Sequence, residues 1–199
     1  MAYTTINKST DYFNTKLYAG NSGTQSITGV GFQPDFLWIK RRTNAGDHNL
    51  VDVIRTSDKT LISNSTGAEY SNSTITSFDS DGFSLSGSDG ALNASSNDYA
   101  SWNWKAGTTG SGTTTGSGTG KVYSYSVNTT AGFSIVKYIG NGNAGQTIPH
   151  HLGAIPGLII VKGLATSRSW MVWSSGGTST KNTCLNSTEP EHDSGASGW

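Results

Sequence analysis

The sequence is poor in charge and in cysteine. Charged residues make up 13% of its 199 residues, and 13 Lys and Arg balance 13 Asp and Glu. Proteins that bind nucleic acids usually carry an excess of basic residues, because contacts with phosphates provide much of their affinity. We therefore expect no nucleic-acid partner. Cys184 is the single cysteine, which excludes a disulfide within the chain.

Long apolar runs are absent as well. No stretch approaches the roughly 18 apolar residues of a membrane-spanning helix, and the N-terminal residues lack the apolar segment of a secretion signal. We therefore expect no insertion into a membrane. Helix-forming residues are scarce, Gly, Ser and Thr are abundant, and 6 Trp, 8 Tyr and 6 Phe are available to build a core. This composition predicts an all-β protein.

The sequence repeats itself. "QPDFLWIK" (33–40) returns as "IPGLIIVK" (155–162), at an offset of 122 residues, and the same offset aligns 56–66 with 178–188. Upstream, "LYAGNSGTQSI" resembles "KYIGNGNAGQTI" once small loop insertions are allowed. The pattern predicts a tandem duplication of a unit of about 120 residues, which is long enough to form a domain.

Short apolar stretches alternate with turn signals inside each unit, and no stretch shows a sustained helical period. Seven or more short strands per unit predict an antiparallel β-sandwich of the jelly-roll type. "FLWI" and "LIIV" are apolar at every position, which predicts central strands buried on both faces. In "ASWNWK", Ala100, Trp102 and Trp104 share one strand face.

The repeat also predicts the domain organisation. Residues 1–106 form the first sandwich, 107–120 a flexible linker because they contain only Gly, Thr and Ser, and 121–199 a second, partial sandwich. Nothing in the second copy corresponds to residues 79–105. Three explanations stay open: the sequence is a fragment of a longer chain, a neighbouring subunit completes the sheet by strand addition, or the second copy is a reduced domain packed on the first.

Several phrases together resemble a family of virion structural proteins of marine bacteriophages that infect cyanobacteria and SAR11-type bacteria. The phrases are "MAYTTINKSTDYFNTKLYAGN", "GVGFQPDFLWIKRR", "SNSTGAE", "SFDSDGFSL" and "NTTAGFSIVKYIGNG". The resemblance covers essentially the whole chain. It implies a tail-fibre-like or particle-surface protein with tandem concanavalin A-like jelly-roll units, located in the virion. Members of that family are usually longer, so a complete second sandwich is in doubt here.

Metal and cofactor sites are not indicated. His150 and His151 are adjacent, so on a strand they point to opposite faces and do not bind one metal ion. "DSDG" (79–82) with "SDG" (88–90) lacks the ligands of a calcium loop, since Phe83 and Gly90 occupy its fifth and twelfth positions. Two hairpin turns are the better interpretation.

Catalytic groups are not indicated either, because no two carboxylates are organised as an acid and a base for glycoside hydrolysis. Aromatic residues do offer a surface for stacking sugar rings. The candidates, with Tyr138, are Trp102, Trp104, Trp170 and Trp173. The shared face of Trp102 and Trp104 describes a core strand equally well, so both interpretations stay open.

The sequence thus predicts a virion structural protein that acts by assembly and host attachment, without catalysis or a cofactor. Its expected partners are other virion proteins and copies of itself, in a trimer if it forms a fibre. The alternative is a lectin-like adhesin that binds host surface polysaccharide. A glycan-degrading enzyme is a third and weaker hypothesis.

Overall fold

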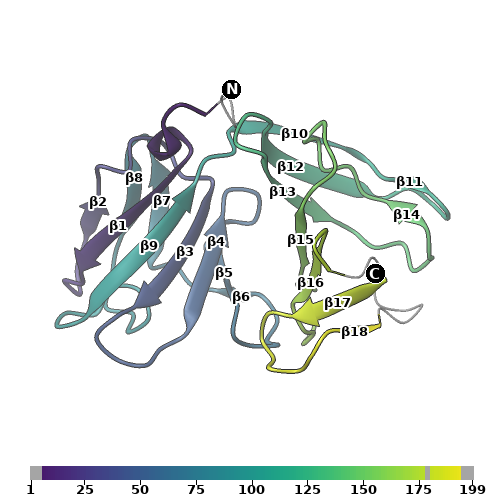
Figure 1. The fold of residues 1–199 in the computed structure, drawn as a ribbon. Helices are drawn as coiled ribbons and strands as arrows, with labels where there is room; N and C mark the ends of the chain where they lie inside the picture. Colours follow the sequence, from purple (N-terminus) through teal and green to yellow (C-terminus); the bar gives the residue numbers. More distant parts are fainter. Residues whose placement is uncertain (1–5, 178–179, 194–199) are drawn as a thin grey trace.

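The computed structural model describes residues 6–177 and 180–193, and strands dominate it (Figure 1). All strand pairs are antiparallel. The predicted all-β class with antiparallel sheets is therefore confirmed, while the jelly-roll topology stays a prediction. Within the described residues, no helix has the length and apolar character needed to cross a membrane.

The first half begins with a short 3-10 helix and continues with nine strands. These elements are η1 (Ser9–Asp11), β1 (Phe13–Ala19), β2 (Gln25–Ile27), β3 (Phe36–Arg41), β4 (His48–Asp52), β5 (Thr56–Ile62), β6 (Tyr70–Ser71), β7 (Ile75–Asp79), β8 (Gly82–Leu85) and β9 (Asp98–Trp104).

The second half contributes nine more strands in its described residues. They are β10 (Thr108–Thr113), β11 (Thr115–Gly116), β12 (Val122–Asn128), β13 (Phe133–Tyr138), β14 (Gln146–Thr147), β15 (Leu158–Val161), β16 (Met171–Ser174), β17 (Lys181–Cys184) and β18 (His192–Asp193).

Two sheets pack face to face in the first half and form a β-sandwich. One has the order β1-β9-β3-β4-β5-β6, and the other β2-β8-β7. Alternate side chains on facing strands fill the space between the two sheets. This core consists of Ile27, Leu37, Ile39, Val51, Ile75, Phe83, Leu85, Leu92 and Tyr99.

Strand β3 lies between β9 and β4, as the apolar sequence "FLWI" predicts. Leu37 and Ile39 are fully buried in the core. Phe36 and Trp38 lie on the opposite face and are half-buried. Because both faces of the strand carry apolar side chains, β3 contributes at the same time to the core and to the outer surface of the sandwich.

Residues 107–120 are not the flexible linker that their composition predicts. They form β10 and β11, and β10 pairs along its whole length with β12. Gly110 lies opposite Tyr125 and Gly112 opposite Tyr123. A methyl group on these glycines would come within 2.6 and 2.7 Å of the two tyrosine hydroxyl oxygens. The glycines therefore make room for aromatic rings that cross the neighbouring strand.

Six strands of the second half follow the order of six strands in the first. At an offset of 122 residues, β3, β4, β5 and β6 correspond to β15, β16, β17 and β18, and the four strands of each group follow one another in the same order within their sheet. Along the chain, β1 and β2 come before β3, and β13 and β14 come before β15 in the same way. The strand order agrees with the predicted duplication, which itself stays an inference from the sequence, as does the division at residues 106 and 121.

Strand β15 departs from the prediction made for "LIIV". It lies at the edge of its sheet, and Leu158, Ile159 and Ile160 are 57, 38 and 42% exposed. The prediction of a central strand buried on both faces is therefore wrong. The physical reason is that no strand among the described residues takes the place that β9 holds beside β3.

Of the two hairpin turns predicted at "DSDG" (79–82) and "SDG" (88–90), the structure contains one. Asp79 opposes Gly82 in the β7–β8 hairpin, so the first predicted hairpin turn is confirmed. Residues 88–90 do not close a hairpin, because they lie in the connection from β8 to β9, and these two strands belong to different sheets. In that connection the Asp89 carbonyl oxygen accepts the N–H groups of Leu92 and Asn93.

The second half packs on the outer face of the six-stranded sheet, the face turned away from β2-β8-β7 (Figure 1). Trp170 is 5% exposed and packs with Leu50 and Leu61. Its indole N–H donates a hydrogen bond to the Ile62 carbonyl oxygen at 2.9 Å. A buried tryptophan from one half thus fills a site on the other.

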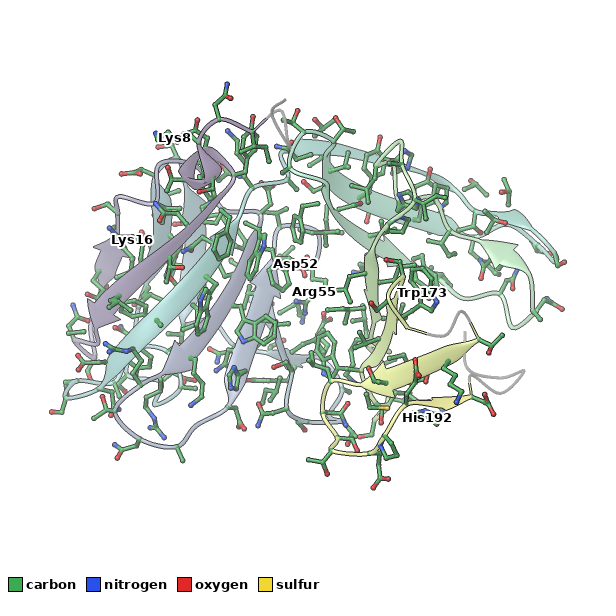
Figure 2. All side chains as sticks on the ribbon, viewed as in Figure 1. Lys8, Lys16, Asp52, Arg55, Trp173 and His192 are labelled. Atoms are coloured by element: carbon green, nitrogen blue, oxygen red, sulfur yellow. The ribbon has the colours of Figure 1, made fainter. Side chains whose placement is uncertain are left out.

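A buried ion network lies beside this junction. Figure 2 shows Asp52 and Arg55 in the centre of the molecule, between the two halves. Arg55 Nε lies 2.6 Å from Asp52 Oδ2, and Arg55 Nη1 lies 3.1 Å from Glu69 Oε2. The Glu69 N–H in turn donates to the Leu164 carbonyl oxygen at 2.8 Å. The network therefore joins β4, the turn after it and the second half.

Asp35 provides a second polar link between the halves. Its carboxylate accepts hydrogen bonds from the Ala106 N–H at 2.9 Å and the Ser126 hydroxyl at 3.2 Å. Burial raises the pKa of Asp35, and these hydrogen bonds oppose the shift. Ser126 belongs to β12, so the carboxylate connects the start of β3 with the sheet of the second half.

Candidate functional site

The outer face of the six-stranded sheet carries a row of aromatic side chains. Trp102 on β9 lies opposite Trp38 on β3, and Trp104 lies opposite Phe36. Side chains alternate along a strand, so these residues lie on the face opposite to Tyr99, which belongs to the core. The register of β3 and β9 thus brings together tryptophans that are more than 60 residues apart in the sequence.

A cavity of about 240 Å³ opens on this face, lined by Trp38, His48, Trp102 and Trp104. Its lining is almost entirely apolar. Sites for drug-sized ligands usually have volumes of about 300–1,000 Å³, so this cavity suits a single ring rather than a large molecule. Flat indole faces are suited to stacking on such a ring.

His48 fixes the orientation of the Trp38 ring. The Trp38 indole N–H donates to His48 Nδ1 at 2.9 Å, and the two rings meet edge to face with centroids 5.9 Å apart. An indole N–H is only a donor, so Nδ1 is unprotonated and the neutral ring carries its proton on Nε2. Burial lowers the pKa of His48, the charge of Lys40 lowers it further, and Asp47 opposes both effects.

Trp104 is held on the other side of the cavity by three phenylalanines. The centroid of its ring lies 4.8 Å from that of Phe13 and 5.4 Å from that of Phe36. Phe133 stacks on Trp104 with ring centroids 6.0 Å apart and an interplanar angle of 21°. Because Phe133 belongs to β13, the second half of the chain contributes to the surroundings of the cavity.

The chemistry of the cavity is that of its aromatic side chains. The cavity offers three indole rings and a neutral imidazole with an Nε2–H donor. Such a set can stack on one face of a ring and donate one hydrogen bond to it.

The structure brings together two of the four tryptophans that the sequence proposes. Trp102 and Trp104 line the cavity, and neither belongs to the buried core. Trp170 lies in the cluster between the halves. Trp173 lies on β16 and is half-buried (Figure 2), and Tyr138 is 38% exposed at the end of β13. The predicted stacking role for these residues stays a prediction.

Two lining residues are not among the sequence candidates. Trp38 and His48 come from β3 and β4, and Lys40 lies opposite His48 in their register. The signal in the sequence was the alternation of Phe36 and Trp38 with Leu37, which places two aromatic residues on one face. Only the pairing of β3 with both β9 and β4 shows that this face is shared.

The two adjacent histidines face different partners. The His151 ring stacks on Tyr125 with centroids 3.8 Å apart, and its Nε2 lies 3.1 Å from the Tyr123 hydroxyl oxygen. His150 Nδ1 accepts the Leu152 N–H. In the part of the chain that the structure describes, no three His, Cys, Asp or Glu residues gather in a way that could hold a metal ion.

Comparison with known proteins identifies a family. A comparison with curated proteins gave no match, and one with solved structures gave none either. Residues 8–199 match the family described as "Domain of unknown function (DUF7483)". This match covers both halves of the chain, from the residues before η1 through all the strands described above. The chain therefore belongs to the DUF7483 family.

Proposed function

We propose that the protein is a structural component of a bacteriophage particle, at its surface or in a tail appendage. It acts without catalysis, by assembling with other virion proteins and with copies of itself. The resemblance of the sequence to virion structural proteins of marine phages supports this proposal. A rigid antiparallel sandwich is also a suitable building block for a particle surface.

The observation that carries the assembly function is the distribution of exposed apolar side chains. Large exposed apolar groups mark surfaces that bind other proteins. Among the described residues of the first half such side chains are few, namely Leu17 and Tyr70. In the second half they are more numerous: Val122, Tyr138, Ile139, Ile155, Leu158, Ile159, Ile160 and Leu185.

Purified particles provide the test of the particle location. Mass spectrometry of particles isolated on a density gradient should detect the chain, and antibody labelling should place it on the surface or on an appendage. A chain found only in the soluble lysate, and never with particles, would contradict the proposal.

A second candidate function is the binding of host polysaccharide, favoured by the cavity of Trp38, His48, Trp102 and Trp104. Sugar rings have apolar faces that stack on indoles, and their hydroxyl groups can accept the imidazole N–H. Many copies on one particle would provide avidity even if each site binds weakly. This function is compatible with assembly, since none of the four residues that line the cavity is among the exposed apolar residues of the second half.

Glycan binding has a direct test. The chain is applied to an array of bacterial envelope polysaccharides, and a binding sugar is then titrated against Trp102→Ala. Truncation of a central tryptophan typically costs about 2 kcal/mol, or roughly thirtyfold in affinity. Trp173→Ala is the matched control, because Trp173 does not line the cavity, and it should bind as well as the parent chain. Equal losses in both variants, or no binding to any sugar, would contradict the proposal.

A further inference from the structure

We propose that the open edge of β15 accepts an antiparallel strand with the side-chain pattern of β9, supplied by a neighbouring polypeptide chain. The inference deepens the assembly function proposed above, on which it rests, because it names the contact and the kind of partner. It follows from comparing the hydrogen-bonding edges of corresponding strands in the two halves.

The first half provides the template. Strand β9 lies between β1 and β3 and pairs with both. The Gly20 N–H donates to the Asn97 carbonyl oxygen at 2.9 Å, and the Arg42 N–H donates to the Asp98 carbonyl oxygen at 2.7 Å. In an antiparallel strand, the N–H and C=O groups of one residue point to one edge, and those of the next residue point to the other edge. The even-numbered residues of β1 and β3 therefore direct their backbone groups toward β9.

Strand β15 repeats the alternation of β3. The Asp35 carbonyl oxygen accepts the Val53 N–H, and the Gly157 carbonyl oxygen accepts the Ser175 N–H. Asp35 and Gly157 correspond at the offset of 122 residues. The odd-numbered residues of β15 therefore bond to β16. Leu158 and Ile160 direct their backbone N–H and C=O groups to the opposite edge, where no described strand lies.

Strand β13 supports the same conclusion independently. Phe13 corresponds to Phe133 and Tyr18 to Tyr138. The Ile139 N–H donates to the Val122 carbonyl oxygen, so the odd-numbered residues of β13 face β12. The even-numbered residues of β13 direct their backbone groups to the other edge of the strand. This edge corresponds to the edge of β1 that is hydrogen-bonded to β9. Within the described residues, both strands that would flank a counterpart of β9 thus have that edge unpaired.

The side chains along β15 are suited to a partner of the β9 type. In the first half Trp104 opposes Phe36 and Trp102 opposes Trp38. The residues of β15 at these two positions are Leu158 and Ile160, which are apolar and exposed. An incoming strand in the same register would place two large apolar side chains on them, while its backbone would satisfy the open edge. Strand addition of this kind gains affinity from backbone hydrogen bonds and specificity from alternate side chains.

Edge strands that expose apolar side chains are otherwise a liability, because they pair with strands of other chains. Strand β15 carries none of the usual protections, as its four residues include neither a charge nor a proline. This favours a surface that is covered in the assembled state.

A labelled peptide of residues 97–105, "NDYASWNWK", is the probe for this edge. It is titrated against the full chain, with binding followed by fluorescence anisotropy. The control peptide "NDYASWWNK" has the same composition, but its two tryptophans are adjacent and lie on opposite strand faces. We expect the first peptide to bind and the control to bind at least roughly tenfold more weakly, because no register places both of its tryptophans on the apolar side chains of β15.

Two variants at one position test the backbone contact. Ile160→Pro removes the N–H that an incoming strand would use and places a ring at the edge, without removing a hydrogen bond to β16. Ile160→Ala keeps that N–H. We expect Ile160→Pro to lose peptide binding by about tenfold or more, and Ile160→Ala to retain most of it. Circular dichroism and thermal unfolding establish that both variants are folded.

Three results would overturn the inference: equal binding of the two peptides, unchanged binding by Ile160→Pro, or a homodimer that Ile160→Pro dissociates while no peptide binds. The last result would assign the edge to a second copy of β15. None of them decides whether the chain is part of a particle, which the mass spectrometry tests separately.

Discussion

At the scale of single residues, the most informative side chain is Arg55. Its guanidinium contacts the Asp52 and Glu69 carboxylates and donates to the carbonyl oxygens of Leu50 and Lys59. The side chains of Asp52 and Arg55 are 4 and 6% exposed. A buried charge is stable only when its partners are in place. Arg55 therefore neutralises two carboxylates at the junction of the halves.

Removing Arg55 should be strongly destabilising. Arg55→Ala leaves the buried Asp52 carboxylate without a counter-charge, and we expect the free energy of unfolding to fall by about 3 kcal/mol or more. Lys59→Ala is the control, since the Lys59 ammonium contacts Asp58 and the Ser71 hydroxyl in an exposed position; it should cost less than about 1 kcal/mol. Urea unfolding measures both. Similar losses in the two variants would contradict this role of Arg55.

At the scale of elements, the Gly- and Thr-rich strand β10 shows how composition can mislead. Glycine usually weakens a strand because it has no side chain to pack. Here two glycines of β10 let the rings of Tyr123 and Tyr125 lie across the strand. The tyrosines supply the contacts that the glycines lack, so β10 is stabilised by its neighbour β12.

Gly110→Ala should destabilise the protein, because it disturbs the contact of β10 with the tyrosines of β12. The added methyl group would lie 2.6 Å from the Tyr125 hydroxyl oxygen, so the ring must move, and overpacking of this kind typically costs about 1–3 kcal/mol. Gly140→Ala is the matched control, because a methyl group at Gly140 meets no atom within 4 Å. Thermal unfolding and the near-ultraviolet circular dichroism of the tyrosines measure the difference. A variant as stable as the control would show that the tyrosines do not need the glycine.

At the scale of the whole molecule, the two halves form a common interface rather than two separate bodies. Trp170 fills a site beside Leu50 and Leu61, and Phe133 stacks on Trp104 at the edge of the cavity. The outer face of the first sandwich is thus covered at both of these places by the second half. The cavity lies on the same face, so its shape depends on how the halves pack.

Trp170→Ala should weaken the packing between the two halves. Truncation of a buried tryptophan typically costs about 3–5 kcal/mol, and the Ile62 carbonyl oxygen would lose its hydrogen bond. The Glu69 and Arg168 amides, which bond across the junction, should then exchange with deuterium faster than in the parent chain. Leu185→Ala is the control, as Leu185 is 39% exposed. Unchanged protection of these two amides in Trp170→Ala would show that other contacts hold the halves together.

Part of the site was predictable from sequence. Alternation along β9 placed Trp102 and Trp104 on one face, because the side-chain period of a strand is two. Trp38 and His48 were not found, because their contribution depends on which strands pair. A residue near 40 and a residue near 100 share a surface only through the register of β3 with β9.

The sequence by itself determined the all-β class and the hairpin turn at residues 79–82. These properties are local, since they depend on alternating side chains and on residues that favour turns. Only the tertiary structure decided that residues 107–120 contain the strands β10 and β11, that the outer face holds a tryptophan cavity, and that β15 is an edge while β3 is central. These properties depend on pairing partners. Two strands with similar apolar sequences differ in burial because β9 lies beside one of them and no described strand lies beside the other.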